Sequence, residues 1–343
     1  MIFHNSSCAS VMVGDCLASL RTLPDRSVNC CVTSPPYFGL RDYGTGTWTG
    51  GSPDCDHVVG ELRRGLGLAD SAASTRGGGH KAAEVEGVKA KSECPKCGAK
   101  RVDMQIGLEE TPAAFIARLV DVFSEVRRVM SDEGTLWVNI GDSYGKDKSL
   151  IGIPWMLAFA LRADGWYLRQ EIIWHKPNPM PESVTDRCTK SHEQLFLLTK
   201  SPRYYYDVDA VKEPAVKGAS GSSFNTGKTA EHQMRRASDA PRVDTDMRNR
   251  RSVWTIPTRP YAGAHFAVFP PALVEPCILA GCPVDGVVLD PFGGSGTTAG
   301  VALLHGRNAL LLELNPEYAA LMPDRVKYII DKHPKPIQLK AAA

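Results

Sequence analysis

The sequence has no apolar run long enough to cross a membrane and almost no net charge. A membrane helix needs about 18 or more apolar residues in succession, and polar residues interrupt every apolar stretch before that length. The first residues, MIFHNSSCASVMVGD, lack the basic start and long apolar segment of a secretory signal. We therefore expect a cytoplasmic globular protein, and 343 residues suffice for one large core with an appended module.

The sequence also lacks a cysteine pattern typical of a disulfide framework. Its ten cysteines are scattered, and Cys30 and Cys31 are adjacent within an apolar run. A chain of this size can rely on a hydrophobic core rather than on covalent links. We expect reduced thiols, and a metal site as a role for some of them.

The net charge of +2 conceals one basic stretch. Residues 212–251 carry more Lys and Arg than Asp and Glu and are rich in Gly, Ser, Thr and Asn. Such a segment on an otherwise balanced protein indicates contact with a polyanion, with an ordinary solvated loop as the alternative.

Apolar runs and helical patterns alternate along most of the chain. This alternation predicts an α/β fold with a mostly parallel sheet covered by helices on both faces. Residues 45–103 interrupt the pattern with a tract rich in Gly, Ser and Ala, which we interpret as an insertion. The predicted strands span 11–15, 28–33, 135–140, 167–174, 194–199, 287–290 and 308–314, and helices are expected over 16–23, 111–130, 154–163 and 271–280, then from 297 and from 316.

A glycine-rich turn near the C-terminus has the layout of a nucleotide-binding βαβ unit. An apolar strand ends at Asp290, and the turn that follows contains Gly294, Gly296 and Ala299 in the pattern G-x-G-x-x-A. These small residues let the backbone approach a ligand and let helix and strand pack closely. The next strand ends at Glu313, where a carboxylate can accept hydrogen bonds from both ribose hydroxyls.

The residues around the turn favour one kind of nucleotide. Asp290 would repel a pyrophosphate but could accept hydrogen bonds from an ammonium group. Pro291 and Phe292 suit an apolar or sulfonium ligand better than a diphosphate. S-adenosylmethionine, which has a ribose, a positive sulfur and an amino acid end, fits these features. A nicotinamide-dependent oxidoreductase shares the turn and is the competing interpretation.

A second motif, Ser34-Pro35-Pro36-Tyr37, follows a predicted strand early in the chain. Together with Asp290-Pro-Phe-Gly-Gly-Ser-Gly it resembles the catalytic and cofactor motifs of the DNA amino-methyltransferases. The catalytic motif comes first and a basic variable region separates the two, as in the beta class of that family. The resemblance covers about residues 10–55 and 103–330, and it implies a Rossmann-like sheet of the methyltransferase type with circularly permuted motif order.

The chemistry explains why such a tetrapeptide is useful. A base amine in a duplex is paired and stacked, so the nucleotide must be rotated out and held in a pocket. Pro35 and Pro36 fix the backbone and leave carbonyl oxygens free to accept from the amine. Tyr37 offers a flat face for stacking, and Ser34 can accept a further hydrogen bond.

Four other residues are further candidates for the site. Asp15 resembles the acid that contacts the cofactor adenine, although it could simply cap the following helix. His265, in the segment HFAVFPP, resembles the motif that lines the methionine end of the cofactor, and a structural role is the alternative. Asp142 and Asn178 are candidates for the target pocket.

The leading serine of the tetrapeptide favours one base. In this family Ser usually accompanies cytosine N4 methylation, whereas Asp or Asn accompanies adenine N6 methylation. Ser34 therefore favours cytosine N4, with adenine N6 as the alternative. Methylation at cytosine carbon 5 needs a nucleophilic thiol, and Cys277, in the only Pro-Cys pair, falls in an amphipathic helical stretch that indicates packing.

The insertion contains a possible zinc site. Cys94-Pro-Lys-Cys97-Gly is typical of a zinc knuckle turn, and Cys55 with His57 would complete four ligands. A zinc ion would replace the small hydrophobic core that the insertion lacks. Unligated thiols in a loop are the alternative.

We expect double-stranded DNA as the substrate, a partner restriction nuclease as a possible associate, and a monomer or homodimer. The predicted organisation consists of a catalytic half at 1–44 and 104–180, the insertion at 45–103, a target recognition region at 181–262, a cofactor-binding half at 263–332 and a tail at 333–343.

Overall fold

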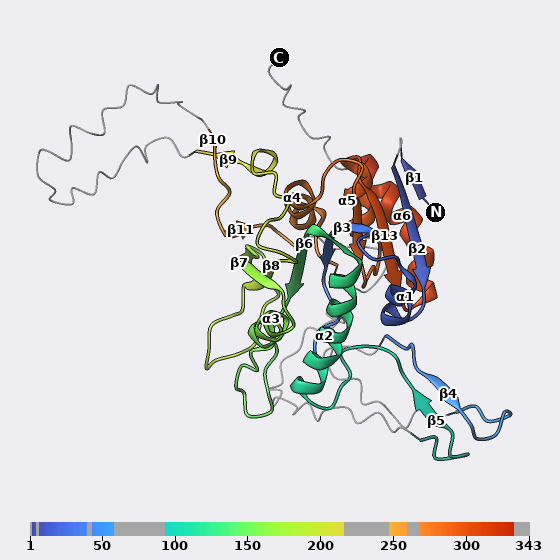
Figure 1. The fold of residues 1–343 in the computed structure, drawn as a ribbon. Helices are drawn as coiled ribbons and strands as arrows, with labels where there is room; N and C mark the ends of the chain where they lie inside the picture. Colours follow the sequence, from blue (N-terminus) through green and yellow to red (C-terminus); the bar gives the residue numbers. More distant parts are fainter. Residues whose placement is uncertain are drawn as a thin grey trace, which may run out of the picture.

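A nine-stranded sheet forms the centre of the protein (Figure 1). The computed structural model describes residues 2–4, 7–39, 43–57, 93–215, 247–258 and 268–332. Across the sheet the strands follow the order β1 (Ile2–His4), β2 (Ser7–Val13), β13 (Asn308–Glu313), β12 (Val287–Asp290), β3 (Val28–Thr33), β6 (Met130–Ile140), β8 (His192–Thr199), β7 (Tyr167–His175) and β11 (Val253–Thr255).

The predicted mostly parallel sheet is confirmed. Strands β2, β13, β12, β3 and β6 run parallel in succession, and β8 runs antiparallel to both of its neighbours, β6 and β7. The alternation of strands and helices did not predict this reversed strand. Because of it, the start of β8 lies at the same sheet edge as the ends of the parallel strands.

Helices cover both faces of the sheet, as predicted. On one face α1 (Cys16–Thr22), α2 (Pro112–Val129) and α3 (Ile153–Ala163) pack side by side, and on the other α4 (Pro271–Gly281), α5 (Thr297–Leu304) and α6 (Pro316–Lys332) do so. Neighbouring residues of β3 divide between the two layers: Cys30 packs with α4 and α5, and Cys31 with α1 and α2. Burial of both faces explains why these strands are continuously apolar.

Local signals in the sequence fix where the helices begin. The Thr111 hydroxyl accepts a hydrogen bond from the Ala114 amide at 3.1 Å, and Pro112 occupies the first turn of α2. Asp15 caps α1 in the same way, accepting from the Ala18 amide at 2.8 Å. None of the helices described is long and apolar enough to span a bilayer.

Two small pairs of strands lie outside the main sheet. Strands β4 (Thr47–Thr49) and β5 (Lys100–Val102) pair antiparallel and project beyond the carboxyl edge, at the lower right of Figure 1. Strands β9 (Glu213–Pro214) and β10 (Met247–Arg248) pair at the opposite end, beside the 3-10 helix Asp209–Val211.

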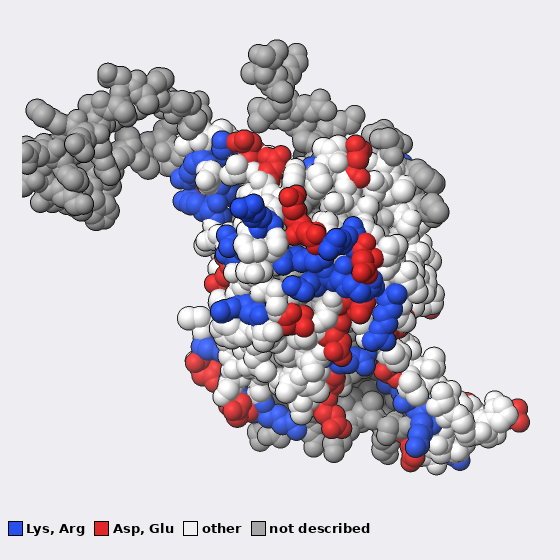
Figure 2. Space-filling model, in the orientation of Figure 1, with Lys and Arg blue, Asp and Glu red and all other residues white. Residues whose placement is uncertain are grey.

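On the face shown in Figure 2, positive and negative side chains alternate across the middle of the molecule. Among the ion pairs of the described residues, Arg128, near the end of α2, pairs with Asp25 and Glu125, and Lys200 pairs with Asp132. These partly exposed pairs neutralise one another and contribute little individually to stability.

The contact between α4 and the sheet generates a stability prediction. A Cβ on Gly281 would lie 2.3 Å from Thr135 Oγ1 and 2.6 Å from Trp137 Nε1, both buried. We expect Gly281→Ala to lower the free energy of unfolding by about 1–3 kcal/mol, because α4 must move away from the sheet. Urea denaturation measures the change.

The exposed Ala272 of the same helix provides a control. Ala272→Ser should change the free energy of unfolding by less than about 0.5 kcal/mol. Equal stability of the Gly281→Ala and wild-type proteins would contradict the close approach of α4 to β6.

Candidate active site

A cavity of about 350 Å³ opens at the carboxyl edge of the sheet, a volume suited to a small molecule. The tetrapeptide that follows β3 and the glycine turn that follows β12 both line it. The further lining residues come from the ends of β2 and β13, the start of β8, the segments before β4, after β5 and before α4, and the start of α6. Among them are Asp15, Tyr43, Thr45, Gln105, Glu193, Phe269, Glu313, Asn315 and Tyr318.

A buried carboxylate ties the two motifs together. Asp290 is 1% exposed and accepts hydrogen bonds from the hydroxyls of Thr33 and Thr298, each at 2.7 Å, and from the Phe292 amide at 3.1 Å. Thr33 immediately precedes Ser34, and Thr298 belongs to the first turn of α5. Asp290 therefore links the tetrapeptide, the glycine turn and α5, although Thr33 and Asp290 lie 257 positions apart in the sequence.

Burial also changes the acidity of this group. Desolvation raises the pKa of Asp290 to about 6, although the hydrogen bonds from Thr33, Thr298 and the Phe292 amide oppose the shift. Asp290 is not among the cavity-lining residues. The structure therefore shows Asp290 organising the turn from beneath, whereas the sequence predicted that it contacts the cofactor directly; that contact stays a prediction.

Glycine is required in the turn for its backbone conformation. Gly294 and Gly296 have φ values of 50° and 85°, in the left-handed region that other residues rarely adopt. The Gly294 amide donates to Glu313 Oε2 at 2.7 Å, so the turn and the end of β13 hold each other. A Cβ on Gly300, one turn into α5, would lie 2.8 Å from Ile329, which explains the close packing of α5 on α6.

Glu313 lies in the cavity wall, where the sequence placed a ribose-binding acid. Its other carboxylate oxygen accepts from the Asn315 amide at 2.9 Å. Burial raises the pKa of Glu313, with the Asn315 and Gly294 amides opposing the shift. The carboxylate is thus fixed in place by backbone donors and faces the cavity.

The ring of the tetrapeptide is held by an acid that the sequence analysis missed. The Tyr37 hydroxyl donates to Glu193 Oε2 at 2.6 Å, and Ser34 also bonds that hydroxyl. Glu193 is the second residue of β8 and further accepts from Lys176 and, at 3.1 Å, from Asn139. Burial and the neighbouring Glu193 raise the pKa of Tyr37 well above its usual range, so the hydroxyl stays a donor.

The glycine turn carries two hydroxyls that are ready for a ligand. Ser295 and Thr297 line the cavity and are 5% and 2% exposed. Among the residues described, neither hydroxyl has a hydrogen-bond partner. They lie at the N-terminus of α5, where backbone amides and the helix dipole favour an anionic group.

The remaining predicted site residues occupy different places. Asp15 both caps α1 and lines the cavity, so the two interpretations of it are compatible. His265 lies outside the described residues, while Val268 and Phe269 of the same segment line the cavity.

Asp142 and Asn178 bind backbone groups instead of lining the cavity. The Asp142 carboxylate accepts from the amides of Ser143, Gly152 and Ile153 and so shapes the start of α3. Asn178 exchanges hydrogen bonds with Thr258 and joins the ends of β7 and β11. Their predicted roles in a target pocket stay predictions.

The sequence matches a family model described as DNA methylase, which covers N6 and N4 methyltransferases, over residues 28–323. The protein belongs to this DNA methyltransferase family. It is 40% identical to the Type II methyltransferase M.Cfr9I of Citrobacter freundii, over 93% of this chain and 88% of that protein. It is 38% identical to the Type II methyltransferase M.SmaI of Serratia marcescens, over 94% and 92% of the two chains.

Solved methyltransferases share the fold. The cytosine-N4-specific PvuII DNA methyltransferase aligns with a TM-score of 0.58 and 16% identity, over 95% of this chain and 93% of that one. A putative DNA modification methylase from Thermus thermophilus, solved with S-adenosyl-L-methionine, aligns with a TM-score of 0.52 and 22% identity, over 95% and 97% of the chains. The Rossmann-like methyltransferase fold expected from the motifs is thereby confirmed.

Membership of this DNA methyltransferase family removes the oxidoreductase alternative. A methyltransferase acting on carbon 5 is disfavoured by the state of Cys277. That residue is 1% exposed within α4, its thiol bonds the Leu273 carbonyl, and burial raises its pKa far above the ordinary value. The interpretation of Cys277 as a packing residue agrees with this geometry.

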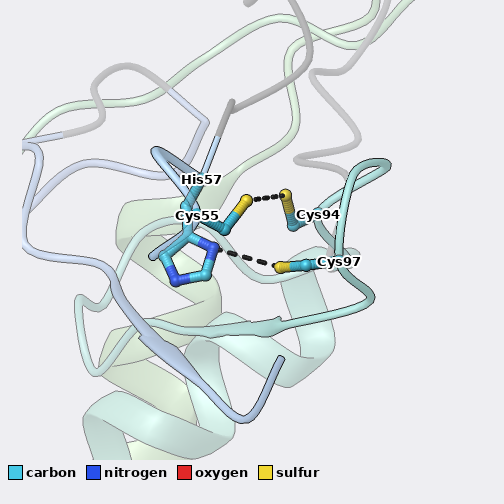
Figure 3. Close-up of side chains that lie close together, drawn as sticks. All are labelled: Cys55, His57, Cys94 and Cys97. Atoms are coloured by element: carbon cyan, nitrogen blue, oxygen red, sulfur yellow. Dashed lines mark hydrogen bonds between the residues drawn. The ribbon is translucent and has the colours of Figure 1, made fainter. Parts of the chain in front are cut away.

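The four predicted metal ligands also come together. The ligand atoms of Cys55, His57, Cys94 and Cys97 all lie within 4.8 Å of one another at the tip of the β4–β5 pair (Figure 3). The cluster lies outside the cavity lining.

The raised pKa of Asp290 makes stability depend on pH. A carboxyl whose pKa is higher when folded stabilises the folded state below its unfolded pKa, and this contribution is lost as pH rises through about 6. Asn at this position is neutral throughout. Between pH 4 and 7.5, the unfolding free energy of wild type minus that of Asp290→Asn should therefore fall by about 1–3 kcal/mol.

Chemical denaturation of both proteins at several pH values measures this difference. Asp285→Asn is the matched control, because Asp285 lies in an exposed turn before the same strand. A difference that stays constant, or that grows with pH, would contradict the buried environment of Asp290.

Proposed function

We propose that this DNA methyltransferase transfers a methyl group from S-adenosylmethionine to the exocyclic N4 amine of a cytosine rotated out of duplex DNA. The observation that carries the proposal is the shared cavity: Ser34 to Tyr37 and the glycine turn line one space and are joined by the bond between Thr33 and Asp290. Donor and acceptor can therefore meet within it.

The residues present fit S-adenosylmethionine, which supplies an electrophilic methyl group on a positive sulfur. Glu313 faces the cavity and can accept from the ribose hydroxyls. Ser295 and Thr297, whose hydroxyls are unsatisfied among the described residues, can bind the carboxylate of the amino acid end. Phe292 and Asp15 line the wall on which the adenosine would lie.

The tetrapeptide is suited to hold the base amine. Pro35 is buried, whereas Ser34 and Tyr37 are partly exposed, and all of them line the cavity. Ser34 and the proline-flanked carbonyls would accept from the amine and direct its nitrogen toward the methyl donor. Glu193 holds Tyr37 for stacking and so acts as a positioning residue.

Cytosine N4 is favoured over adenine N6 by Ser34. A serine hydroxyl leads the tetrapeptide where adenine enzymes of this family usually carry Asp or Asn. The PvuII enzyme, named as cytosine-N4-specific, has the same fold, and at 16% identity that likeness supports the fold alone. The base assignment thus rests on Ser34.

We further propose that a partner restriction nuclease accompanies this enzyme, and that the domain boundaries are those predicted from the sequence. Within those boundaries, residues 181–262 would read the DNA site. In the part of this region that the structure describes, Arg248 and Arg251 both donate to Glu213, and Arg250 stacks on Trp254. These contacts fix Arg248, Arg250 and Arg251 beside β10 and β11, and the basic residues of 212–251 would neutralise DNA phosphates.

The base assignment has a direct test. DNA from a methylation-deficient host that expresses the protein should contain N4-methyldeoxycytidine, measured by mass spectrometry of its nucleosides. Single-molecule sequencing of the same DNA should place the modification at one recurrent site. N6-methyldeoxyadenosine in its place would overturn cytosine N4 while leaving the methyltransferase activity intact.

Two Tyr37 variants separate stacking from the hydrogen bond to Glu193. Tyr37→Ala should slow single-turnover methylation by at least about 100-fold, since it removes both stacking and anchoring. Tyr37→Phe keeps the ring and should slow it by only about tenfold, the effect of one hydrogen bond to a charged group.

Fluorescence anisotropy with labelled duplex serves as the control and should show DNA affinity within about threefold of wild type for both variants. If Tyr37→Ala methylates at the wild-type rate, the role given to the tetrapeptide is wrong. A wild-type protein that binds DNA but methylates none would instead indicate a DNA-binding protein without catalytic activity.

A further inference from the structure

The cluster at the tip of the β4–β5 pair has the geometry of a tetrahedral metal site. The sulfurs of Cys55 and Cys94 lie 3.9 Å apart, and the Cys97 sulfur lies 3.3 Å from His57 Nδ1. Around a tetrahedral zinc, bonds of about 2.3 Å to sulfur and about 2.0 Å to nitrogen place two sulfurs about 3.8 Å apart and sulfur about 3.5 Å from nitrogen. The four side chains converge on one point, as Figure 3 shows.

Backbone amides around the cluster point toward the sulfurs. The amides of Lys96 and Cys97 bond the Cys94 sulfur, and those of Ser52 and Ala99 bond the Cys97 sulfur. Such bonds stabilise thiolates, the form in which cysteine binds a metal. Protonated, unligated thiols in a loop do not require these backbone donors.

Glycine makes the turn possible. Gly98 has a φ of 70° and its amide donates to the Cys94 carbonyl at 2.9 Å, which closes the knuckle that the sequence predicted. A Cβ on Gly51 would lie 2.7 Å from the Cys97 sulfur, so this position must stay small.

The cluster replaces a hydrophobic core. Strands β4 and β5 have three residues each and are mostly exposed, and a two-stranded pair of that size is at best marginally stable by itself. Among the residues described, neither strand contributes to the hydrophobic clusters of the domain. The Trp48 ring stacks on His57, with 5.3 Å between ring centroids, and thereby couples β4 to the cluster.

A chain of contacts connects this tip to the cavity. Arg101 of β5 forms a buried ion pair with Asp103 at 3.1 Å, and Asp103 accepts from Thr45 at 2.8 Å and from the Gln105 amide at 3.0 Å. Gln105 in turn accepts from the Tyr43 amide at 2.7 Å. The cavity is lined by Thr45, Gln105 and Tyr43. The Tyr43 ring contacts the ring of Tyr318, which also lines the cavity.

We propose that Cys55, His57, Cys94 and Cys97 bind one structural zinc ion, and that this ion holds in place the wall of the cavity formed by Tyr43, Thr45 and Gln105. Four protein ligands complete the tetrahedron and leave no position for a substrate, so the metal takes no part in methyl transfer. The effect on the cavity rests on the proposed cofactor site, whereas the zinc itself does not.

Metal content tests the site directly. Untagged protein, purified without chelator, should contain about one zinc per chain by mass spectrometry of its metals. Cys94→Ser and Cys97→Ser should lose most of it, while Cys188→Ser, which removes an exposed cysteine outside the cluster, should keep it. A content below about half an equivalent, or a Cys55–Cys94 disulfide in the peptide map, would overturn the metal site.

Stepwise zinc release from wild-type protein avoids dependence on variants that fail to fold. A mercurial thiol reagent should free zinc, detected with a metallochromic dye, in proportion to the cysteines that react. Calorimetry at each step of the titration should show the Kd for S-adenosylmethionine rising about tenfold, because the cavity wall formed by Tyr43, Thr45 and Gln105 loses its support. The thermal unfolding transition of the main domain should be retained.

An unchanged Kd after full zinc release would overturn the link to the cavity. Protein that holds stoichiometric zinc but binds no S-adenosylmethionine before the titration would contradict the proposed function and leave the zinc site standing. Restored affinity after thiol reductant and added zinc would support the link, whereas restoration by reductant alone would count against it.

Discussion

The hydrogen bonds of one buried carboxylate hold the catalytic end of this protein together. Asp290 accepts hydrogen bonds from the hydroxyls of Thr33 and Thr298 and from the Phe292 amide, so the end of β3, 257 positions away, meets the glycine turn and α5 at a single group. Burying a charged carboxylate without a cation is unfavourable, as its raised pKa indicates. The three donors offset part of that penalty, and in doing so they fix the glycine turn and the tetrapeptide beside one another at a single cavity.

The reversal of β8 has a comparable consequence on the other side of the cavity. If β8 ran parallel to its neighbours, Glu193 would lie at the far edge of the sheet. Because it runs antiparallel, the first residues of the strand face the tetrapeptide, and Glu193 can bind Tyr37, Asn139 and Lys176 together. The ring that we expect to stack on the target base is therefore positioned by the sheet itself.

The β4–β5 pair extends the same wall outward. Its connection to the cavity runs through the largely buried pair of Arg101 and Asp103, and the four proposed zinc ligands lie together at its tip. The proposed zinc ion would supply the rigidity that the two short, mostly exposed strands of this pair lack.

The sequence by itself determined the alternation of strands and helices, the helix starts after Asp15 and at Thr111, the two motifs and the identity of the four candidate metal ligands. These features depend on local spacing, residue chemistry or backbone conformation, which are written in consecutive residues. Only the tertiary structure decided the direction of β8, the role of Glu193, and the burial of Asp290 beneath the turn and not in the cavity wall. Those outcomes depend on which strands become neighbours across hundreds of residues, and a carboxylate's surroundings are set by that packing and not by the residues beside it in the chain.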